Sequence, residues 1–196
     1  YDGTKTINSG AISAIGGTIG SETLTVSGNG TLNLGGAGSR TIADTSSFTL
    51  GNGSNGGIGG NYTLDGGTHS VTVSPKPVTI AGTKQYDGDT VVHSNSTEAA
   101  ITLVSGESLL WTGNGVSNSA DVGNQNVAQG TWSLADQTHA ASNYTFSGAS
   151  MTINITPRPV LITGTRQYDG TTDVDGGDIT TFTAQGTFSN GGSSDL

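Results

Sequence analysis

Apolar and polar residues alternate along much of the chain, for example in Leu24–Val26, Thr31–Leu34 and Met151–Ile155. A period of two is typical of a strand that turns one face to a core and the other to water. No long stretch shows the 3.6-residue spacing of a helix, and the abundant Gly and β-branched residues disfavour helices. The pattern therefore predicts an all-β chain.

The predicted strands recur in a similar order in the two halves of the sequence. They are Thr23–Val26, Thr31–Leu34, Phe48–Leu50, Tyr62–Leu64, His69–Val73 and Val78–Thr83, then Leu109–Thr112, Thr131–Leu134, Tyr144–Phe146, Met151–Ile155 and Val160–Thr165. Asn-Gly pairs in Gly28–Gly30 and Gly113–Gly115 predict tight turns, because Asn and Gly both tolerate positive φ. Glu98–Ile101 is the one segment where we allow for a short helical turn.

The tripeptide Tyr-Asp-Gly occurs three times, beginning at Tyr1, Tyr86 and Tyr168. The spacings, 86 − 1 = 85 and 168 − 86 = 82 residues, are long for a solenoid repeat and suit a small β domain. We predict a structural turn at each copy: Asp accepts backbone N–H groups, Gly takes positive φ, and Tyr packs across a domain edge. The residues assigned this role are Tyr1, Asp2, Gly3, Tyr86, Asp87, Gly88, Tyr168, Asp169 and Gly170.

Two Pro-x-Pro segments contain all the prolines, which are Pro75, Pro77, Pro157 and Pro159. Proline locks φ, restricts the residue before it and lacks the N–H that a sheet uses, so each segment is predicted to be a stiff junction. The junctions divide the chain into 1–74 (a repeat that lacks its opening strand if Val78–Thr83 belongs to the repeat after it), a complete repeat at 75–156 and a partial one at 157–196. Each complete repeat is expected to be a small β-sandwich of Greek-key or immunoglobulin-like type. A β-solenoid is the alternative, although no period of about 20–30 residues is visible.

Composition and charge restrict the possible partners. The net charge is −9 and the six Lys and Arg residues are scattered, so a nucleic-acid surface is not expected. There is no cysteine, which removes disulfides and thiolate chemistry. No apolar run reaches the 18 or so residues of a membrane helix, so we expect no membrane insertion. The hydrophobic content of 31% permits only a thin core for each repeat.

With Tyr-Asp-Gly, Asn143-Tyr-Thr and the Pro-Lys/Arg-Pro junctions, the chain resembles the YDG and MBG (mostly β, Gly-rich) repeats. Such repeats occur in large secreted bacterial adhesins, including haemagglutinin-like proteins of two-partner secretion. The resemblance implies a non-enzymatic stalk segment, secreted to the bacterial cell surface, whose partners are adjacent repeats of the same polypeptide. It implies a part in adhesion and biofilm formation, and it carries no catalytic residues to transfer.

A few residues invite a chemical interpretation. Asp169, Asp173, Asp175 and Asp178 lie close together in sequence, and such spacing of carboxylates is a weak indication of Ca²⁺; otherwise no cofactor is expected. Trp111 and Trp132 are weak candidates for stacking on sugar rings, which makes a carbohydrate-binding module, for a surface glycan or exopolysaccharide, the alternative function. No catalytic constellation is identified, since the three His residues lack convergent partners in sequence.

Overall fold

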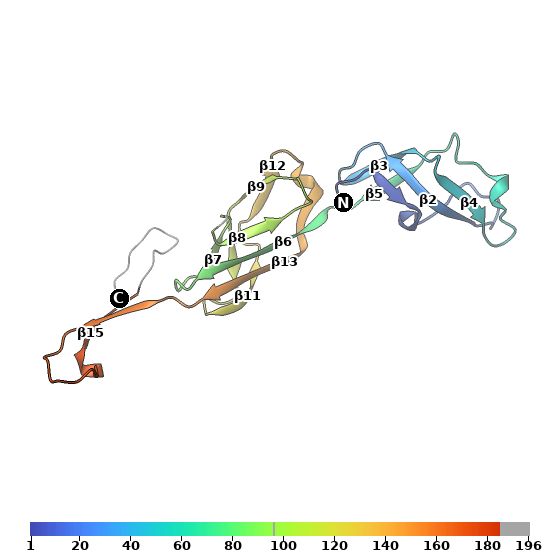
Figure 1. Ribbon diagram of the computed structural model, residues 1–196. Coiled ribbons are helices and arrows are strands. Elements are labelled where there is room, and N and C mark those ends of the chain that lie inside the picture. Colours follow the sequence, from blue (N-terminus) through green and yellow to red (C-terminus); the bar gives the residue numbers. More distant parts are fainter. Residues whose placement is uncertain (96, 185–196) are drawn as a thin grey trace. The chain divides into compact units, whose positions relative to one another are not determined.

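The computed structural model describes residues 1–95 and 97–184, and within them almost every regular element is a β-strand (Figure 1). Strands account for 46% of the structure, and the sheets curl like half-barrels. The described residues contain no α-helix, and no helix among them is long and apolar enough to cross a membrane. The predicted all-β class is confirmed. The four short 3₁₀ helices are η1 (Ser9–Ala11), η2 (Gly59–Asn61), η3 (Ala141–Asn143) and η4 (Gly176–Asp178).

The strands range from three residues to the 13 residues of β13. In chain order they are β1 (Thr6–Asn8), β2 (Leu24–Leu32), β3 (Gly38–Asp44), β4 (Phe48–Asn52), β5 (Ser70–Val73), β6 (Lys76–Gln85), β7 (Val91–His93), β8 (Ala99–Thr102), β9 (Leu109–Thr112), β10 (Asn114–Ser117), β11 (Gly123–Ala128), β12 (Ser133–Asp136), β13 (Tyr144–Thr156), β14 (Val160–Gly164) and β15 (Ile179–Ala184). Where registers are described, the pairs are antiparallel. A solenoid of parallel rungs is therefore not what these strands build.

The chain forms two compact units, each assembled from segments that are distant in sequence. The first unit contains Tyr1–Val78, Leu103–Leu110 and Ala135–Ala149. The second contains Thr79–Thr102, Trp111–Leu134 and the described part of Ser150–Leu196. The last twelve residues of the predicted third repeat, 185–196, lie outside the described residues.

In the first unit, β2 bends at Gly28 and so belongs to two parts of one sheet. Its first half pairs with β4, whereas its second half pairs with β1 and β3, and β3 in turn pairs with β5. Gly28 has φ +95°, and a Cβ there would lie 2.0 Å from the Ser47 carbonyl oxygen, so only Gly fits. The tight turn predicted at Gly28–Gly30 is thus wrong: the close backbone approach makes this Gly a bend within one strand.

The core of the first unit lies between the two halves of this curled sheet. Alternate residues of the strands point inward, as the period of two predicts. The buried residues Ile7, Leu32 and Ile42 are surrounded by partly buried Ile12, Phe48, Val71 and Val73.

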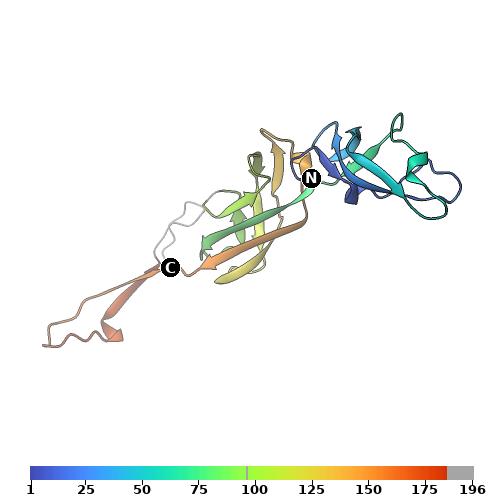
Figure 2. The same ribbon diagram turned by 45° about the vertical axis from the view of Figure 1, so that its right-hand side comes forward.

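A six-stranded sheet, in the order β7-β10-β11-β13-β6-β8, supplies most of the second unit. β6 and β13 are far apart in sequence, yet they lie side by side in both views (Figures 1 and 2). Ile80, Val92, Val127, Ile153 and Ile155 form the buried face of this sheet. These strands bury alternate residues, which the hydrophobic pattern predicts.

Three other predicted elements differ from the structure. The helical turn allowed for at Glu98–Ile101 does not extend past Glu98: the Ala99 N–H bonds the Asn95 carbonyl over 3.0 Å, and Ala99–Thr102 then pairs along β6 as strand β8. Tyr62–Leu64 is not a strand and follows the 3₁₀ helix η2 instead. Pro77 lies in the first residues of β6, a strand position that proline tolerates, so the Pro75–Pro77 junction leads directly into a strand.

Candidate functional site

The three Tyr-Asp-Gly copies form the same turn. In each, the carboxylate Oδ1 of Asp accepts the backbone N–H two residues further on, over 2.9 Å at Asp2, 3.0 Å at Asp87 and 2.9 Å at Asp169. The following Gly has φ between +79° and +82° in every copy. Hydrogen bonds from the backbone N–H and hydroxyl of Thr4 hold the pKa of Asp2 below its usual range, and those of Thr171 do the same for Asp169. The motif therefore specifies a local backbone shape.

A second backbone contact fixes where each of the first two turns lies. The N-terminal ammonium nitrogen of Tyr1 donates to the Ser74 carbonyl over 2.7 Å, and the amide nitrogen of Tyr86 donates to the Thr156 carbonyl over 2.9 Å. Ser74 and Thr156 are the residues directly before the two Pro-x-Pro segments. Each of these two Tyr-Asp-Gly motifs is thus bonded to the residue that precedes the next Pro-x-Pro segment.

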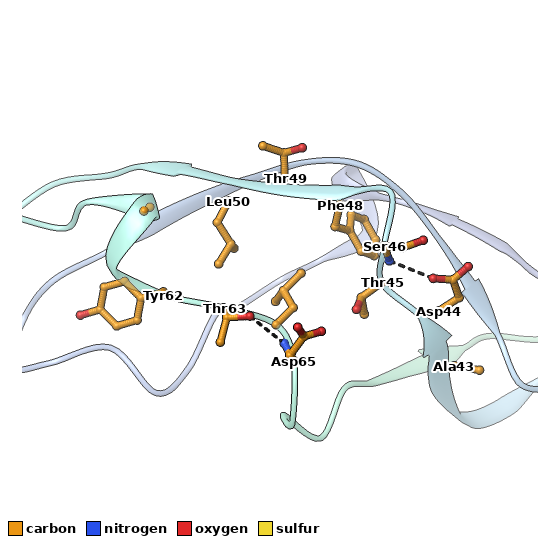
Figure 3. A pocket seen from close by; sticks show the side chains of 13 residues that line it. Ala43, Asp44, Thr45, Ser46, Phe48, Thr49, Leu50, Tyr62, Thr63 and Asp65 are labelled. Carbon is orange, nitrogen blue, oxygen red and sulfur yellow. Dashed lines mark hydrogen bonds between the residues drawn. The ribbon is translucent and has the colours of Figure 1, made fainter.

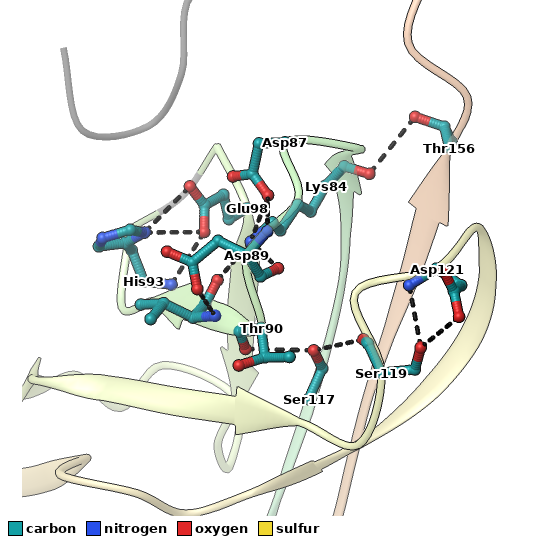
Figure 4. Close-up of polar contacts among 11 residues, drawn as sticks. Lys84, Asp87, Asp89, Thr90, His93, Glu98, Ser117, Ser119, Asp121 and Thr156 are labelled. Atoms are coloured by element: carbon teal, nitrogen blue, oxygen red, sulfur yellow. Dashed lines mark hydrogen bonds and ion pairs between the residues drawn. The ribbon is translucent and has the colours of Figure 1, made fainter. Parts of the chain in front are cut away.

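Lys84 lies beneath the second turn and is only 4% exposed (Figure 4). Its Nζ lies 3.0 Å from Oδ1 of Asp87 and donates to the carbonyls of Asp89 and Val91 over 2.9 and 2.6 Å. A buried ammonium group is tolerated when anionic and carbonyl oxygens replace its water shell. Lys84 therefore ties the turn to the start of β7, which is a structural use of this charge.

The first turn brings Tyr1 onto Glu107 and Tyr144, and sequence reasoning missed this cluster. The Tyr1 and Tyr144 hydroxyls donate to Oε1 and Oε2 of Glu107, the latter over 2.7 Å, and the two rings meet edge to face at 5.6 Å. The Tyr144 hydroxyl also accepts the Val104 N–H over 2.8 Å. Asn143, the residue before Tyr144, is also buried, and its side-chain oxygen accepts the Ala37 N–H over 2.8 Å. We call Glu107 and Tyr144 the Glu107–Tyr144 pair.

Burial, with the Glu107 hydrogen bond and negative charge adding to it, raises the pKa of Tyr1 to about 12. Burial also raises the pKa of Tyr144, and the Glu107 bond contributes. Burial would raise the pKa of Glu107, but the two tyrosine hydroxyls outweigh it and hold that pKa below its usual value. The cluster is thus built around one carboxylate and two neutral phenols.

We predict that Tyr1 gives a late step in an alkaline titration of tyrosinate absorbance. Because its folded-state pKa lies above the value of about 10 for an unfolded tyrosine, its stabilising contribution is complete below pH 10 and is lost as the pH rises toward about 12. Tyr1→Phe should remove that step, and Glu107→Gln should move it to lower pH. A Tyr1→Phe difference curve with its midpoint near pH 10 would contradict the cluster.

The two tryptophans are packed against each other in the second unit. Their rings lie 5.1 Å apart at 62°, and Trp132 is 2% exposed. Burial leaves Trp132 no face for a sugar ring, which corrects its candidacy for stacking. Trp111 is half-buried, and within the described residues neither buried indole nitrogen has a hydrogen-bond partner.

The four candidate Ca²⁺ carboxylates are not gathered into one site. Asp169 pairs with Arg166 over 3.0 Å, and Asp178 accepts the backbone N–H of Asp175 as part of a capping box around η4. Asp173 is exposed. In the described residues no group of three His, Asp or Glu side chains is arranged to hold a metal ion. Asp169, Asp175 and Asp178 therefore serve local turns.

The remaining polar side chains in Figure 4 bond both to nearby residues and to segments distant in sequence, as when the Thr156 hydroxyl donates to the Lys84 carbonyl over 3.4 Å. His93 Nδ1 lies 3.1 Å from Oε2 of Glu98, which also accepts the His93 N–H. The Ser117 hydroxyl donates to the Ser119 carbonyl over 2.7 Å. These bonds satisfy buried groups near the second turn.

An open hollow of about 580 Å³ lies on the first unit (Figure 3). Its lining includes the aromatic rings of Phe48 and Tyr62 and the carboxyl groups of Asp44 and Asp65. Ser46 donates its N–H to Asp44 over 2.8 Å, which holds the pKa of that carboxyl below its usual value. The hollow combines apolar and hydrogen-bonding groups, but it brings together no acid, base and nucleophile.

Comparisons with curated proteins and with solved structures found no match for this chain. A comparison with family models matched one part of it. The part that is matched contains the second Tyr-Asp-Gly turn, Lys84, the Glu107–Tyr144 pair and both tryptophans. Residues 70–153 match the family model of the YDG domain.

Proposed function

We propose that this chain is a non-catalytic structural segment of the stalk of a secreted bacterial adhesin, which holds a distal binding region away from the cell and supports adhesion and biofilm formation. The observation that carries the proposal is the repeated tether from Tyr-Asp-Gly to the residue before Pro-x-Pro. Tyr1 bonds Ser74, and Tyr86 bonds Thr156, in the same way. A chain whose exit from each repeat is fixed can keep its direction through a series of repeats.

The use of the polar residues supports the same proposal. Lys84 and the three motif aspartates hold turns in shape. The net charge of −9 provides solubility and limits attraction between neighbouring acidic stalks. On this proposal, the partners are adjacent repeats of the same polypeptide, at the bacterial surface.

Small-angle scattering tests whether length grows with repeat number. Residues 86–167 span one period in sequence, so one or two further copies inserted after residue 167 keep the phase of the motifs. We expect the maximum dimension to rise by a constant step of about 30–45 Å per copy, because a strand rises about 3.3 Å per residue and β13 has 13 residues. A chain whose dimension grows only as the cube root of its mass would contradict the proposal.

Carbohydrate binding is the second candidate, and the hollow in Figure 3 is the observation that favours it. Aromatic rings beside carboxylates and hydroxyls suit a sugar, which has apolar faces and a rim of hydroxyl groups. A glycan array that includes bacterial exopolysaccharides tests it. Binding that is lost in Asp65→Asn would favour this function over a purely structural one.

A further inference from the structure

The first unit contains the Glu107–Tyr144 pair and also a second copy of it. The Tyr62 hydroxyl donates to Oε2 of Glu22 and accepts the Ile19 N–H over 3.2 Å. The offsets between the copies, 107 − 22 = 85 and 144 − 62 = 82, equal the two spacings of the Tyr-Asp-Gly motif. The same hydrogen-bonded arrangement is therefore built twice by matched residues. We call the second copy the Glu22–Tyr62 pair.

The two copies differ in what covers them. The first turn covers the Glu107–Tyr144 pair, so that Tyr144 is 5% exposed and a Cβ on Gly3 would lie 2.8 Å from Cγ1 of Val104. At the position matching Val104, Ile19 is 75% exposed, and Tyr62 is only half-buried. Within residues 1–95 and 97–184, nothing donates a hydrogen bond to Oε1 of Glu22, the oxygen that matches the acceptor of the Tyr1 hydroxyl.

We propose that the Glu22–Tyr62 pair is a receptor for the Tyr-Asp-Gly turn of a second copy of this chain, whose Tyr86 hydroxyl donates to Glu22 as Tyr1 donates to Glu107. The glycine of the incoming turn packs on Ile19 and so removes the exposed Ile19 side chain from water. Such a contact joins two different surfaces, so it links copies head to tail.

Tyr86 is the tyrosine presented in the required way. Its backbone N–H donates to the Thr156 carbonyl, as the terminal nitrogen of Tyr1 donates to the Ser74 carbonyl, and Tyr86 is 39% exposed. Gly88 has φ +79°, against +82° at Gly3, so the two turns present their edges alike. The turn at Tyr168 is less firmly seated, because the Asp169 side chain is 57% exposed whereas that of Asp87 is 9% exposed.

The inference deepens the proposed function by giving the chemistry of the joint between copies, and it rests on that function only for its biological role. Copies in one polypeptide meet at effective concentrations in the millimolar range, so a weak contact is sufficient there. Separate chains should pair only at comparable concentrations. Pairing and length are measured independently, so one can fail without the other.

Complementary variants of the full chain test the contact by NMR. The ¹⁵N-labelled Tyr86→Phe chain keeps the receptor, and the unlabelled Glu22→Gln chain keeps the turn. On adding the second to the first, up to about 1 mM, we expect saturable shifts at the amides of Ile19, Glu22 and Tyr62. An unlabelled partner that carries both substitutions should bind about tenfold more weakly, because a hydrogen bond to a carboxylate is lost.

Circular dichroism of each variant shows that it is folded before mixing. Equal shifts from both unlabelled partners, shifts confined to other residues, or no shift at about 1 mM would overturn the proposal. As a matched control, Tyr168→Phe in the unlabelled partner should leave the binding curve unchanged. Loss of binding in that control would overturn the assignment of Tyr86.

Discussion

Replacing Trp132 by alanine is expected to lower the free energy of unfolding by about 3–5 kcal/mol, the usual cost of truncating a large buried aromatic residue. Trp132 is among the largest fully buried side chains and packs edge to face on Trp111. A Cβ on Gly115 would lie 2.5 Å from its ring and 2.7 Å from Val127. The ring therefore rests directly on the backbone of β10, which cannot collapse far into the space left behind.

Urea unfolding followed by far-ultraviolet circular dichroism measures this loss without relying on tryptophan emission. Trp132→Phe is the matched control and should cost much less, since it keeps a ring and removes an indole N–H that has no partner within the described residues. Gly115→Ala should destabilise the natural chain but cost less in the Trp132→Ala background, because one of its two clashes is gone. Additive effects would contradict this packing.

The sequence predicts features that depend on neighbours along the chain. An Asp followed by Gly defines its own turn, because the carboxylate reaches the N–H two residues on and Gly permits positive φ. The three copies of the motif accordingly share one geometry, at Asp2, Asp87 and Asp169. The all-β class follows from the period of two in the same local way.

Features that depend on distant segments could not be predicted in this way. Asn-Gly at Gly28–Gly30 has the local chemistry of a tight turn, and only the Ser47 carbonyl, held against Gly28 by pairing with β4, makes it a bend. Ala99–Ile101 likewise becomes part of a strand because β6 is available to pair with it.

The Glu107–Tyr144 pair shows the same limit in the candidate site. Each of them has a matching residue 85 or 82 positions earlier, Glu22 and Tyr62, so the sequence marks both positions as recurring. Their 37-residue separation conceals the hydrogen bond between them. A carboxylate and a phenol that recur at the two spacings of the Tyr-Asp-Gly motif, 85 and 82 residues, were the available signal, and a contact between them was the inference to draw from it.

Replacing Lys84 by methionine is expected to lower the free energy of unfolding by about 3–5 kcal/mol, because the buried Asp87 carboxylate loses the cation that pairs with it. Methionine keeps the apolar stem, so the loss reports the ammonium group rather than packing. Asp87, whose side chain is 9% exposed, would lose the cation 3.0 Å away, and the Asp89 and Val91 carbonyls would lose a donor. Both tryptophans lie in the same unit, so their fluorescence during urea unfolding reports the change.

The third Tyr-Asp-Gly turn supplies a matched control for this charge. Arg166 occupies the position of Lys84 and lies 3.0 Å from Asp169, but the Asp169 side chain is 57% exposed. Exposed pairs contribute at most about 1 kcal/mol, so Arg166→Met should change the transition little. Adding Asp87→Asn to Lys84→Met should recover part of the loss, since the uncompensated charge is removed as well. If Lys84→Met and Arg166→Met had equal effects, burial would not be what makes Lys84 important, and the turn would be held by its backbone bonds alone.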